Sequence, residues 1–339
     1  MLCLALVAGL VWAWPGPPRA AGPATGDQDL LAEIGDLGGF RRLSVAVVQL
    51  DGRRSEVRYA ALGADAHTRY EAGSVTKALT GLVVADAVER EELSLDAVAG
   101  DLLPLGEGDA ARATVRQLVT HTSGLPPLDR GTQFRGLGAA LIGLDPYRSV
   151  GTEELLEAAS STPTGEQTYA YSNLGAALAG QATARAAGLS YPELMRSRLF
   201  EPLGLRETQV QTEAVVRSGR SQYGRRMQPW VFDGYARAGG VVTTSADLAV
   251  LATALLEERA PGMTALEPLA DDPARPGRRV GTFWQLSERD GRTITWHNGR
   301  TGGYSSFVGL DREGGRAVVV LADVASEKTD RLGMRLAGG

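Results

Sequence analysis

The two ends of this 339-residue chain carry β-strand patterns, whereas the long stretch between them does not. Near the N-terminus, the β-branched run LSVAVVQL (43–50) is followed by the turn signal Asp51-Gly52 and by a second strand at about 55–62. Beyond residue 279 the strand pattern returns, and we expect strands at 280–287, 292–298, 304–311 and 316–323. This order predicts an α+β fold with a central antiparallel sheet formed by both chain ends and flanked by helices.

The middle of the chain is rich in Ala and Leu and is interrupted often by Gly and Pro, which predicts several short helices. Helices are expected at 27–40, 74–90, 114–120, 152–160, 173–187, 191–199, 245–258 and 326–336. We therefore expect one domain at 27–339, with an α/β lobe (40–90 plus 260–339) and a mostly helical lobe (91–259). A site between two lobes is the natural place for a pocket.

The N-terminal stretch 2–14 (LCLALVAGLVWAW) is continuously apolar but shorter than the roughly 20 residues that span a bilayer. It is typical of the apolar region of a secretory signal, with small residues at 20–22 where cleavage could fall. We expect residues 1–24 to be a signal peptide or an apolar anchor, and the protein to be exported to the periplasm or the medium. A retained segment would give an N-terminal membrane contact, and a buried first helix is the remaining alternative.

Composition excludes several classes of function. The net charge of −5 provides no basic field for nucleic acid, and no partner protein is implied. The single cysteine, Cys3, lies in the apolar stretch, and the three histidines are far apart without an HExxH pair, so neither a metal nor another cofactor is expected. Neither GxGxxG nor a P-loop occurs, which argues against nucleotide binding.

The segment AGSVTK (72–77) is the strongest local signal of chemistry. Ser74 stands at the start of a predicted helix, and Lys77 follows three residues later on the same helix face, where its amine can reach the hydroxyl. If Ser74 were only a helix cap, an acidic residue or Gln would suit the third helical position, and Lys has the wrong sign there. A residue that is unfavourable for the local helix, and that brings no evident gain in stability, is typical of a functional site. No GxSxG elbow surrounds Ser74, which argues against an α/β-hydrolase.

Two further segments carry polar groups that could serve a site. Tyr171-Ser172-Asn173 precedes a helical run; a tyrosine can relay a proton and an asparagine can orient a neighbour, although a buried loop tyrosine is the simpler interpretation. HNGRTGGY (297–304) follows a strand, and its glycines permit close backbone approach. Taken alone, His297 would be an ordinary strand-end histidine.

Together, S-x-x-K, Y-x-N and a Lys- or His-x-Gly strand, in this order, resemble the motif set of serine β-lactamases and penicillin-binding proteins. The spacing is similar to the class C β-lactamase branch, with its related D-alanyl-D-alanine carboxypeptidases and esterases. The resemblance extends from about residue 40 to about 325 and includes the flanking stretches LVTHTSGLP (118–126), TPTGEQTYAYSN (162–173), EPLGL (201–205) and AGGVVTTSADL (238–248).

The resemblance implies a covalent acyl-enzyme mechanism. Ser74 would attack a carbonyl, and Lys77 with Tyr171 would take its proton and return it to the leaving group. Asn173 would hold the lysine side chain and contact the substrate. The backbone N–H groups of Ser74 and Arg300 would form the oxyanion hole.

The third motif departs from the family pattern, because His297-Asn298-Gly299 stands where many members have Lys-Thr-Gly. Histidine is near neutral at pH 7, so the charge that would bind a substrate carboxylate is in doubt. His297 and Gly299 are still expected to contact the substrate, and Arg300 or Arg279 are candidates to restore the charge. The substrate class remains open between β-lactam, D-amino-acid peptide and ester.

Two expectations remain, one on His121 and one on an alternative function. His121 is assigned to a turn between helices and left outside the site. The alternative function is a catalytically silent member of the same fold that binds cell-wall peptide.

Overall fold

A computed structural model describes residues 16–52, 54–148 and 150–338. Most of the predicted signal or anchor segment at 1–24 therefore lies outside the described residues. Near the start of the described residues the chain already contacts the domain, because the N–H of Ala21 donates to the carbonyl of Arg41 at 2.8 Å. None of the described helices combines the length and apolar character needed to cross a membrane.

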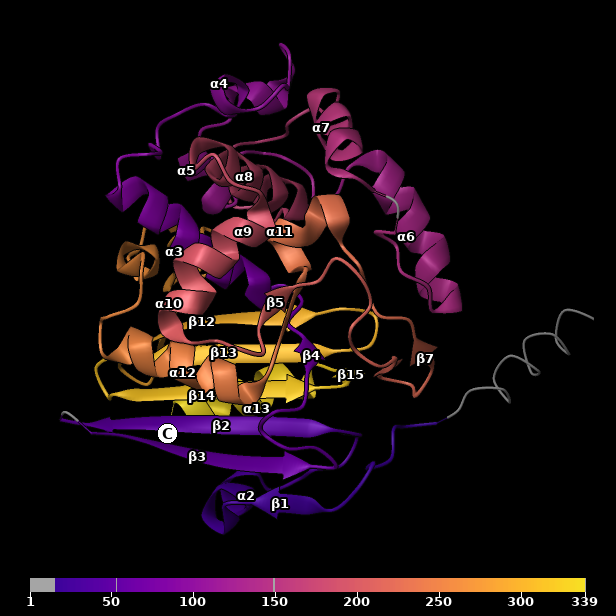
Figure 1. Cartoon of the computed structure of the whole chain (residues 1–339), viewed down its shortest axis with the longest axis vertical. Helices are drawn as coiled ribbons and strands as arrows, with labels where there is room; N and C mark the ends of the chain where they lie inside the picture. Colours follow the sequence, from indigo (N-terminus) through magenta and orange to yellow (C-terminus); the bar gives the residue numbers. More distant parts are fainter. Residues whose placement is uncertain (1–15, 53, 149, 339) are drawn as a thin grey trace, which may run out of the picture.

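Among the described residues, nine strands form one antiparallel sheet in the order β1-β3-β2-β14-β13-β12-β11-β10-β9 (Figure 1). The first long strand, β2, pairs with β14 near the C-terminus, so both chain ends build the sheet as the strand pattern predicted. The strands are β1 (Ala24–Gly26), β2 (Leu43–Asp51), β3 (Arg54–Leu62), β9 (Ala270–Asp271), β10 (Arg278–Val280), β11 (Gln285–Arg289), β12 (Arg292–Arg300), β13 (Ser305–Asp311) and β14 (Arg316–Ala322).

The central strands are apolar on both sides because helices cover both faces of the sheet. On β14, Val318 and Val320 pack in the cluster with α13 (Lys328–Ala337) and α2 (Gln28–Ile34). The intervening Val319 packs in the main core, on the side of α12 (Ser245–Leu256). Side chains alternate between the faces of a strand, so a strand buried on both faces is a continuous hydrophobic run.

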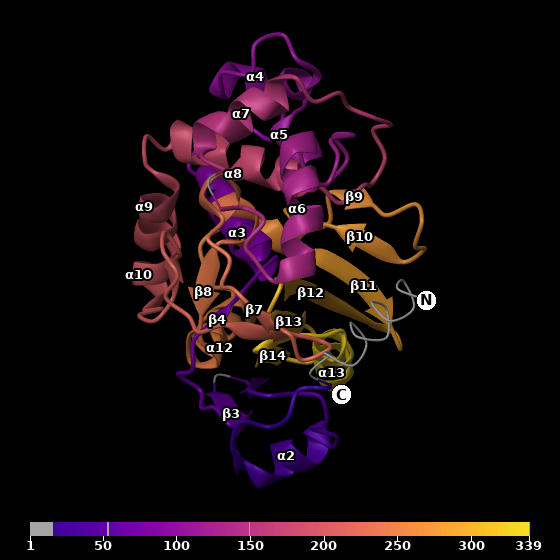
Figure 2. The ribbon, with the colours of Figure 1, turned by 90° about the vertical axis from the view of Figure 1, so that its right-hand side faces the viewer.

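Most of the remaining helices gather towards one end of the sheet, while α10 (Glu201–Leu203) contacts α12, which covers a face of the sheet (Figure 2). The remaining helices are α3 (Val75–Glu89), α4 (Ala99–Leu102), α5 (Val115–Val119), α6 (Arg130–Ile142), α7 (Thr152–Ser160), α8 (Asn173–Ala186), α9 (Tyr191–Met195), α10 and α11 (Ala236–Gly239). Two small three-stranded sheets join the layers: β4 (Tyr70–Glu71) with β8 (Val241–Thr243) and β5 (Gln209–Val210), and β6 (Gly219–Ser221) with β7 (Arg226–Met227) and β15 (Val324–Ala325).

Several predicted helices differ in extent from those observed. The helix expected at 27–40 ends at Ile34, because Gly35 adopts a φ of 68°. The helix expected at 191–199 changes into a π-helix at Arg196–Phe200. The boundaries of the two lobes remain a prediction.

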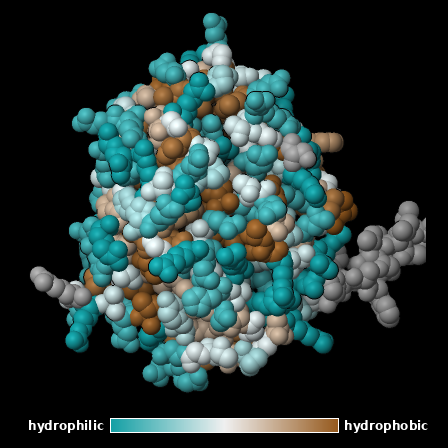
Figure 3. All heavy atoms as spheres, viewed as in Figure 1, coloured by the Kyte–Doolittle hydropathy of each residue, from teal (hydrophilic) through white to brown (hydrophobic). Residues whose placement is uncertain are grey.

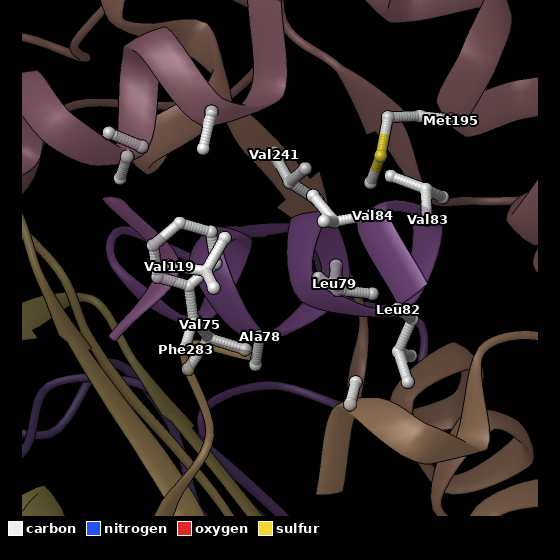
Figure 4. Packing of buried hydrophobic residues seen from close by; sticks show 14 of the residues in the cluster. Val75, Ala78, Leu79, Leu82, Val83, Val84, Val119, Met195, Val241 and Phe283 are labelled. Atoms are coloured by element: carbon white, nitrogen blue, oxygen red, sulfur yellow. The ribbon is translucent and has the colours of Figure 1, made fainter. Parts of the chain in front are cut away.

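The helix α3 carries the Ser74–Lys77 motif and runs through the centre of the core (Figure 4). Val83 faces Met195 and Val84 faces Val241, whereas Leu82 points to another side of the helix. A helix that is apolar on all sides is buried by its neighbours, which hold it in place. By contrast, polar residues dominate the molecular face shown in Figure 3, with apolar residues in scattered groups.

Candidate active site

Ser74 stands at the N-terminus of α3 but does not cap the helix. Its backbone is in the helical region (φ −68°, ψ −8°), and its side chain accepts no capping hydrogen bond. The residue is partly exposed. Gly73 before it adopts a φ of 49°, and a Cβ there would lie 2.8 Å from the backbone nitrogen of Arg300. The turn that presents Ser74 therefore requires glycine.

The amine of Lys77 is completely buried and lies between three oxygen atoms. Its Nζ is 3.2 Å from Ser74 Oγ, 2.6 Å from Asn173 Oδ1 and 2.7 Å from the carbonyl oxygen of Ala238. Burial holds the pKa of Lys77 well below its usual value. A neutral amine has two N–H groups and one lone pair. Because the oxygens of Asn173 and Ala238 can only accept, a neutral amine at this place would direct its two N–H groups to them and keep its lone pair for the Ser74 hydroxyl.

Tyr171 and Asn173 come from the loop that begins α8. The Ser172 hydroxyl accepts from the N–H of Gly175 at 2.9 Å and donates to the carbonyl of Pro126 at 2.7 Å, which fixes the turn. The ring centroid of Tyr171 is 4.9 Å from Lys77 Nζ. Burial raises the pKa of Tyr171, and its hydrogen bond with Ser74 acts in the opposite direction. The Tyr171 hydroxyl is therefore protonated at neutral pH and can donate.

His121 lies in the predicted turn, but it has a second role that the sequence analysis missed. It adopts a φ of 60°, and its buried Nδ1 accepts from the N–H of Ser172 at 3.2 Å. Its ring lies 4.6 Å from the ring of Tyr171, measured between centroids. The histidine thus supports the loop that carries Tyr171 and Asn173. No signal in a single sequence reveals this contact, because 50 residues of chain separate the partners.

His297 is brought to the site by β12 and is fully buried. Its Nδ1 is 2.6 Å from the carbonyl oxygen of Asn298, and since a carbonyl only accepts, Nδ1 carries the proton. Burial lowers the pKa of His297 to about 3, a protonated Lys77 would act in the same direction, and the hydrogen bond to that carbonyl opposes both effects. His297 is therefore neutral at pH 7 and does not replace the charge of a lysine.

Gly299 provides close backbone contact, as its place in the motif suggested. A Cβ on Gly299 would lie 2.9 Å from the backbone nitrogen of Ser74, so β12 passes directly against the start of α3. The backbone of Arg300 lies beside Gly73, as described above. The side chain of Arg300, however, points to Asp330 (3.1 Å) and Glu327 (3.6 Å).

Arg279 pairs with Glu288 at 2.8 Å, so neither of the two expected arginines supplies a free charge to the site. Among the residues that the structure describes, no group of His, Cys, Asp and Glu is placed to hold a metal ion. The structure thus places the side chains of Ser74, Lys77, Tyr171 and Asn173 close together. The backbones of Gly299 and Arg300 lie against the Gly73–Ser74 turn, and His297 is buried on the same strand.

Comparison with known proteins gives a consistent result. Residues 29–337 match the Beta-lactamase family. Penicillin-binding protein 4 of Amycolatopsis lactamdurans is 27% identical over 270 residues, which cover 70% of this chain and 68% of that protein. An unguisins hydrolase of Aspergillus campestris is 26% identical over 289 residues, which cover 76% of this chain and 52% of that protein. The chain thus spans between about half and two thirds of the length of these relatives.

Solved structures share the fold. A D-stereospecific amidohydrolase from a Streptomyces species superposes with a TM-score of 0.72 at 23% identity, over 90% of this chain and 96% of that one. A class C β-lactamase from Rhodobacter sphaeroides superposes with a TM-score of 0.70 at 20% identity, over 91% of this chain and 96% of that one. With the family match over nearly the whole described chain, these results show that the protein belongs to the β-lactamase family, within the superfamily of serine β-lactamases and penicillin-binding proteins.

Proposed function

We propose that this protein is a serine acyl hydrolase that cleaves an amide or an ester through an acyl-enzyme on Ser74. The observation that carries the proposal is the 3.2 Å contact between Lys77 Nζ and Ser74 Oγ, with both other contacts of the amine made to acceptors. A neutral amine held in this way is a general base for the hydroxyl beside it.

In the acylation step, Lys77 takes the proton of Ser74 while Oγ forms a bond to the substrate carbonyl carbon. The carbonyl electron pair moves onto oxygen, where the N–H groups of Ser74 and Arg300 stabilise the negative charge. The close approach of Gly73 to Arg300 supports this assignment. As the intermediate collapses, the bond to the leaving group breaks, and Tyr171 donates a proton to it and is reprotonated by Lys77.

In the deacylation step, a water molecule replaces the leaving group. Tyr171 and Lys77 take a proton from the water as its oxygen attacks the ester carbon of the acyl-enzyme. The ester bond to Ser74 then breaks, Oγ regains a proton, and the acyl group leaves as a carboxylic acid. Asn173 keeps the Lys77 amine in place through both steps.

We assign the protein to the class C-related branch, with a β-lactam, a D-amino-acid peptide or an ester as substrate. The motif order and the amidohydrolase and β-lactamase names of its structural neighbours support this branch. The apolar N-terminal stretch supports export, with a membrane contact if the segment is retained.

Active-site labelling with intact-mass readout tests the proposal. Folded protein treated with a fluorophosphonate or a fluorescent penicillin should gain one adduct, and Ser74→Ala should gain none. Turnover of p-nitrophenyl acetate and nitrocefin should likewise disappear in Ser74→Ala. If the folded protein gains no adduct and turns over neither substrate, the proposal is contradicted. If such protein binds a cell-wall peptide, the alternative of a catalytically silent peptide-binding protein is supported.

A further inference from the structure

The third motif leaves the site without the positive charge that a lysine would provide. His297 is neutral, and the side chains of Arg300 and Arg279 are paired with acidic residues. A substrate carboxylate would therefore need another cationic group close to Tyr171.

A cavity of about 400 Å³ beside Tyr171 contains such groups. Its lining includes the aromatic rings of Tyr169 and Trp296, and the charged side chains Asp272, Arg275 and Arg278. With two guanidinium groups and one carboxylate, the charged lining has a net charge of +1. A ligand with a single negative charge would balance this net charge.

Arg275 lies in the turn between β9 and β10, and Arg278 is the first residue of β10. Backbone hydrogen bonds shape this turn. The N–H of Arg275 donates to the carbonyl of Asp272 at 3.0 Å, and the N–H of Arg278 donates to the carbonyl of Arg275 at 3.0 Å. The N–H of Asp272 donates back to the carbonyl of Arg278 at 2.9 Å. The backbone positions that carry the two guanidinium groups are therefore fixed by hydrogen bonds.

Arg278 is held by aromatic rings and has unused hydrogen-bonding capacity. Its guanidinium carbon lies 5.8 Å from the ring centroid of Tyr169 and 5.4 Å from that of Trp296. Its guanidinium forms an ion pair with Asp272, with Nε 3.8 Å from Oδ2. This distance is too long for a hydrogen bond, and the buried Nε has no other partner among the described residues. Stacking on aromatic faces fixes the plane of a guanidinium and leaves its edge free for a carboxylate.

Arg275 is exposed, and within the described part of the chain its side chain forms no hydrogen bond or ion pair. Its charge acts on the hydroxyl of Tyr169, two residues before Tyr171. The buried amide oxygen of Gln285, which also lines the cavity, has no hydrogen-bond partner among the described residues. The cavity lining thus includes guanidinium groups with unused donors, and an amide oxygen that is an unused acceptor.

Tyr171 identifies which part of a substrate this cavity would hold. In the proposed mechanism Tyr171 donates the proton to the leaving group, so a cavity that Tyr171 lines lies on the leaving-group side. We propose that Arg275 and Arg278 form an anion subsite that selects substrates with a carboxylate on the leaving group. This inference rests on the proposed acyl-hydrolase function.

A matched pair of esters tests the subsite. The probes are 3-acetoxybenzoate, whose leaving group carries a carboxylate, and its uncharged methyl ester. For each ester, kcat/KM is divided by the rate of its hydroxide-catalysed hydrolysis, and the ratio of the two corrected values is the preference. The protein should prefer the carboxylate, and Arg275→Gln together with Arg278→Gln should lower that ratio of corrected kcat/KM values by about 10- to 100-fold. Charge-assisted hydrogen bonds have this magnitude.

Two controls separate the subsite from general effects. Arg279→Gln removes the adjacent arginine, whose side chain pairs with Glu288 instead of lining the cavity, and should leave the preference unchanged. Arg275→Gln alone changes an exposed side chain and should weaken the preference without lowering the melting temperature, even if Arg278→Gln unfolds the protein.

The outcomes distinguish the subsite from the catalytic proposal. If the parent, Arg275→Gln and the double variant all turn over both esters and show the same preference for the carboxylate, the subsite is overturned. The hydrolase function would still stand. Absence of turnover and of Ser74 labelling would overturn the function. Competitive inhibition by 3-hydroxybenzoate, weakened about 10-fold or more in Arg275→Gln, would support the subsite by a readout of binding alone.

Discussion

Lys77 Nζ lies 3.2 Å from Ser74 Oγ, and among the described residues no carboxylate lies within ion-pair distance of this buried amine. An ammonium group in such a place has lost its water without gaining a counter-ion. The neutral amine is favoured instead, and it is the form that can accept the serine proton. Burial of Lys77 therefore links the stability of the fold to the chemistry of the site.

The first prediction concerns the pH dependence of activity. Because Lys77 acts in its neutral form, kcat/KM for p-nitrophenyl acetate should fall as pH drops through the lowered pKa of Lys77, and it should reach its plateau well below the ordinary lysine pKa. His297, with a pKa near 3, should add no titration between pH 5 and 8. Steady-state rates across this range check the prediction. An activity that keeps rising up to the ordinary lysine pKa of about 10.4 would contradict it.

The same lysine should make stability depend on pH. Between the lowered folded-state pKa and the unfolded value of about 10.4, the unfolded chain binds more protons at Lys77 than the folded one, so the unfolding free energy should rise with pH. Lys77→Met removes this contribution and should flatten the curve. Urea unfolding of both proteins from pH 7 to 10 measures the difference, and parallel curves would argue against a depressed pKa.

Tyr171→Phe keeps the ring that contacts His121 and removes only the hydroxyl. We expect kcat/KM to fall about 10²- to 10⁴-fold, because a positioned acid–base group contributes this much. The control is Tyr191→Phe, which removes a buried hydroxyl that lies 2.8 Å from Thr80 Oγ1. Both variants should lose about 0.5–1.5 kcal/mol of stability, but only Tyr171→Phe should lose activity. Equal losses of activity in the two variants would indicate a structural role for Tyr171.

His121 is predicted to be a positioning residue. His121→Ala removes the acceptor for the N–H of Ser172, so acylation of Ser74 should slow by about 10-fold or more, because small displacements of catalytic groups are costly. His121→Asn should restore much of the rate, since asparagine tolerates a positive φ and can accept the same hydrogen bond. Rates of fluorophosphonate labelling, with melting temperatures beside them, provide the test. Equal labelling rates in both variants, at equal stability, would remove this role.

His297→Lys introduces an amine where the family often has one. It should raise kcat/KM for nitrocefin, which carries a carboxylate, relative to the uncharged p-nitrophenyl acetate. It should also lower the unfolding free energy at neutral pH, because His297 is fully buried and an ammonium group at this position would lose its hydration. An unchanged ratio of the two rates in folded protein would show that no substrate carboxylate reaches this position.

The sequence by itself determined the features that depend on neighbouring residues and on pattern. The strands at both chain ends indicated the sheet in which β2 pairs with β14. The three-residue spacing of Ser74 and Lys77 indicated one helix face, and the structure places their polar atoms within reach. Such features follow from helix and strand periodicity, which a single chain displays directly.

Only the tertiary structure decided the environment of these groups. Lys77 meets Asn173 and the carbonyl of Ala238 across 96 and 161 residues of sequence, and its pKa depends on that enclosure. The support by His121 and the placement of Arg278 in the cavity that Tyr171 also lines likewise depend on which segments pack together. Burial, desolvation and long-range hydrogen bonds are properties of the assembled core, and no local pattern of residues encodes them.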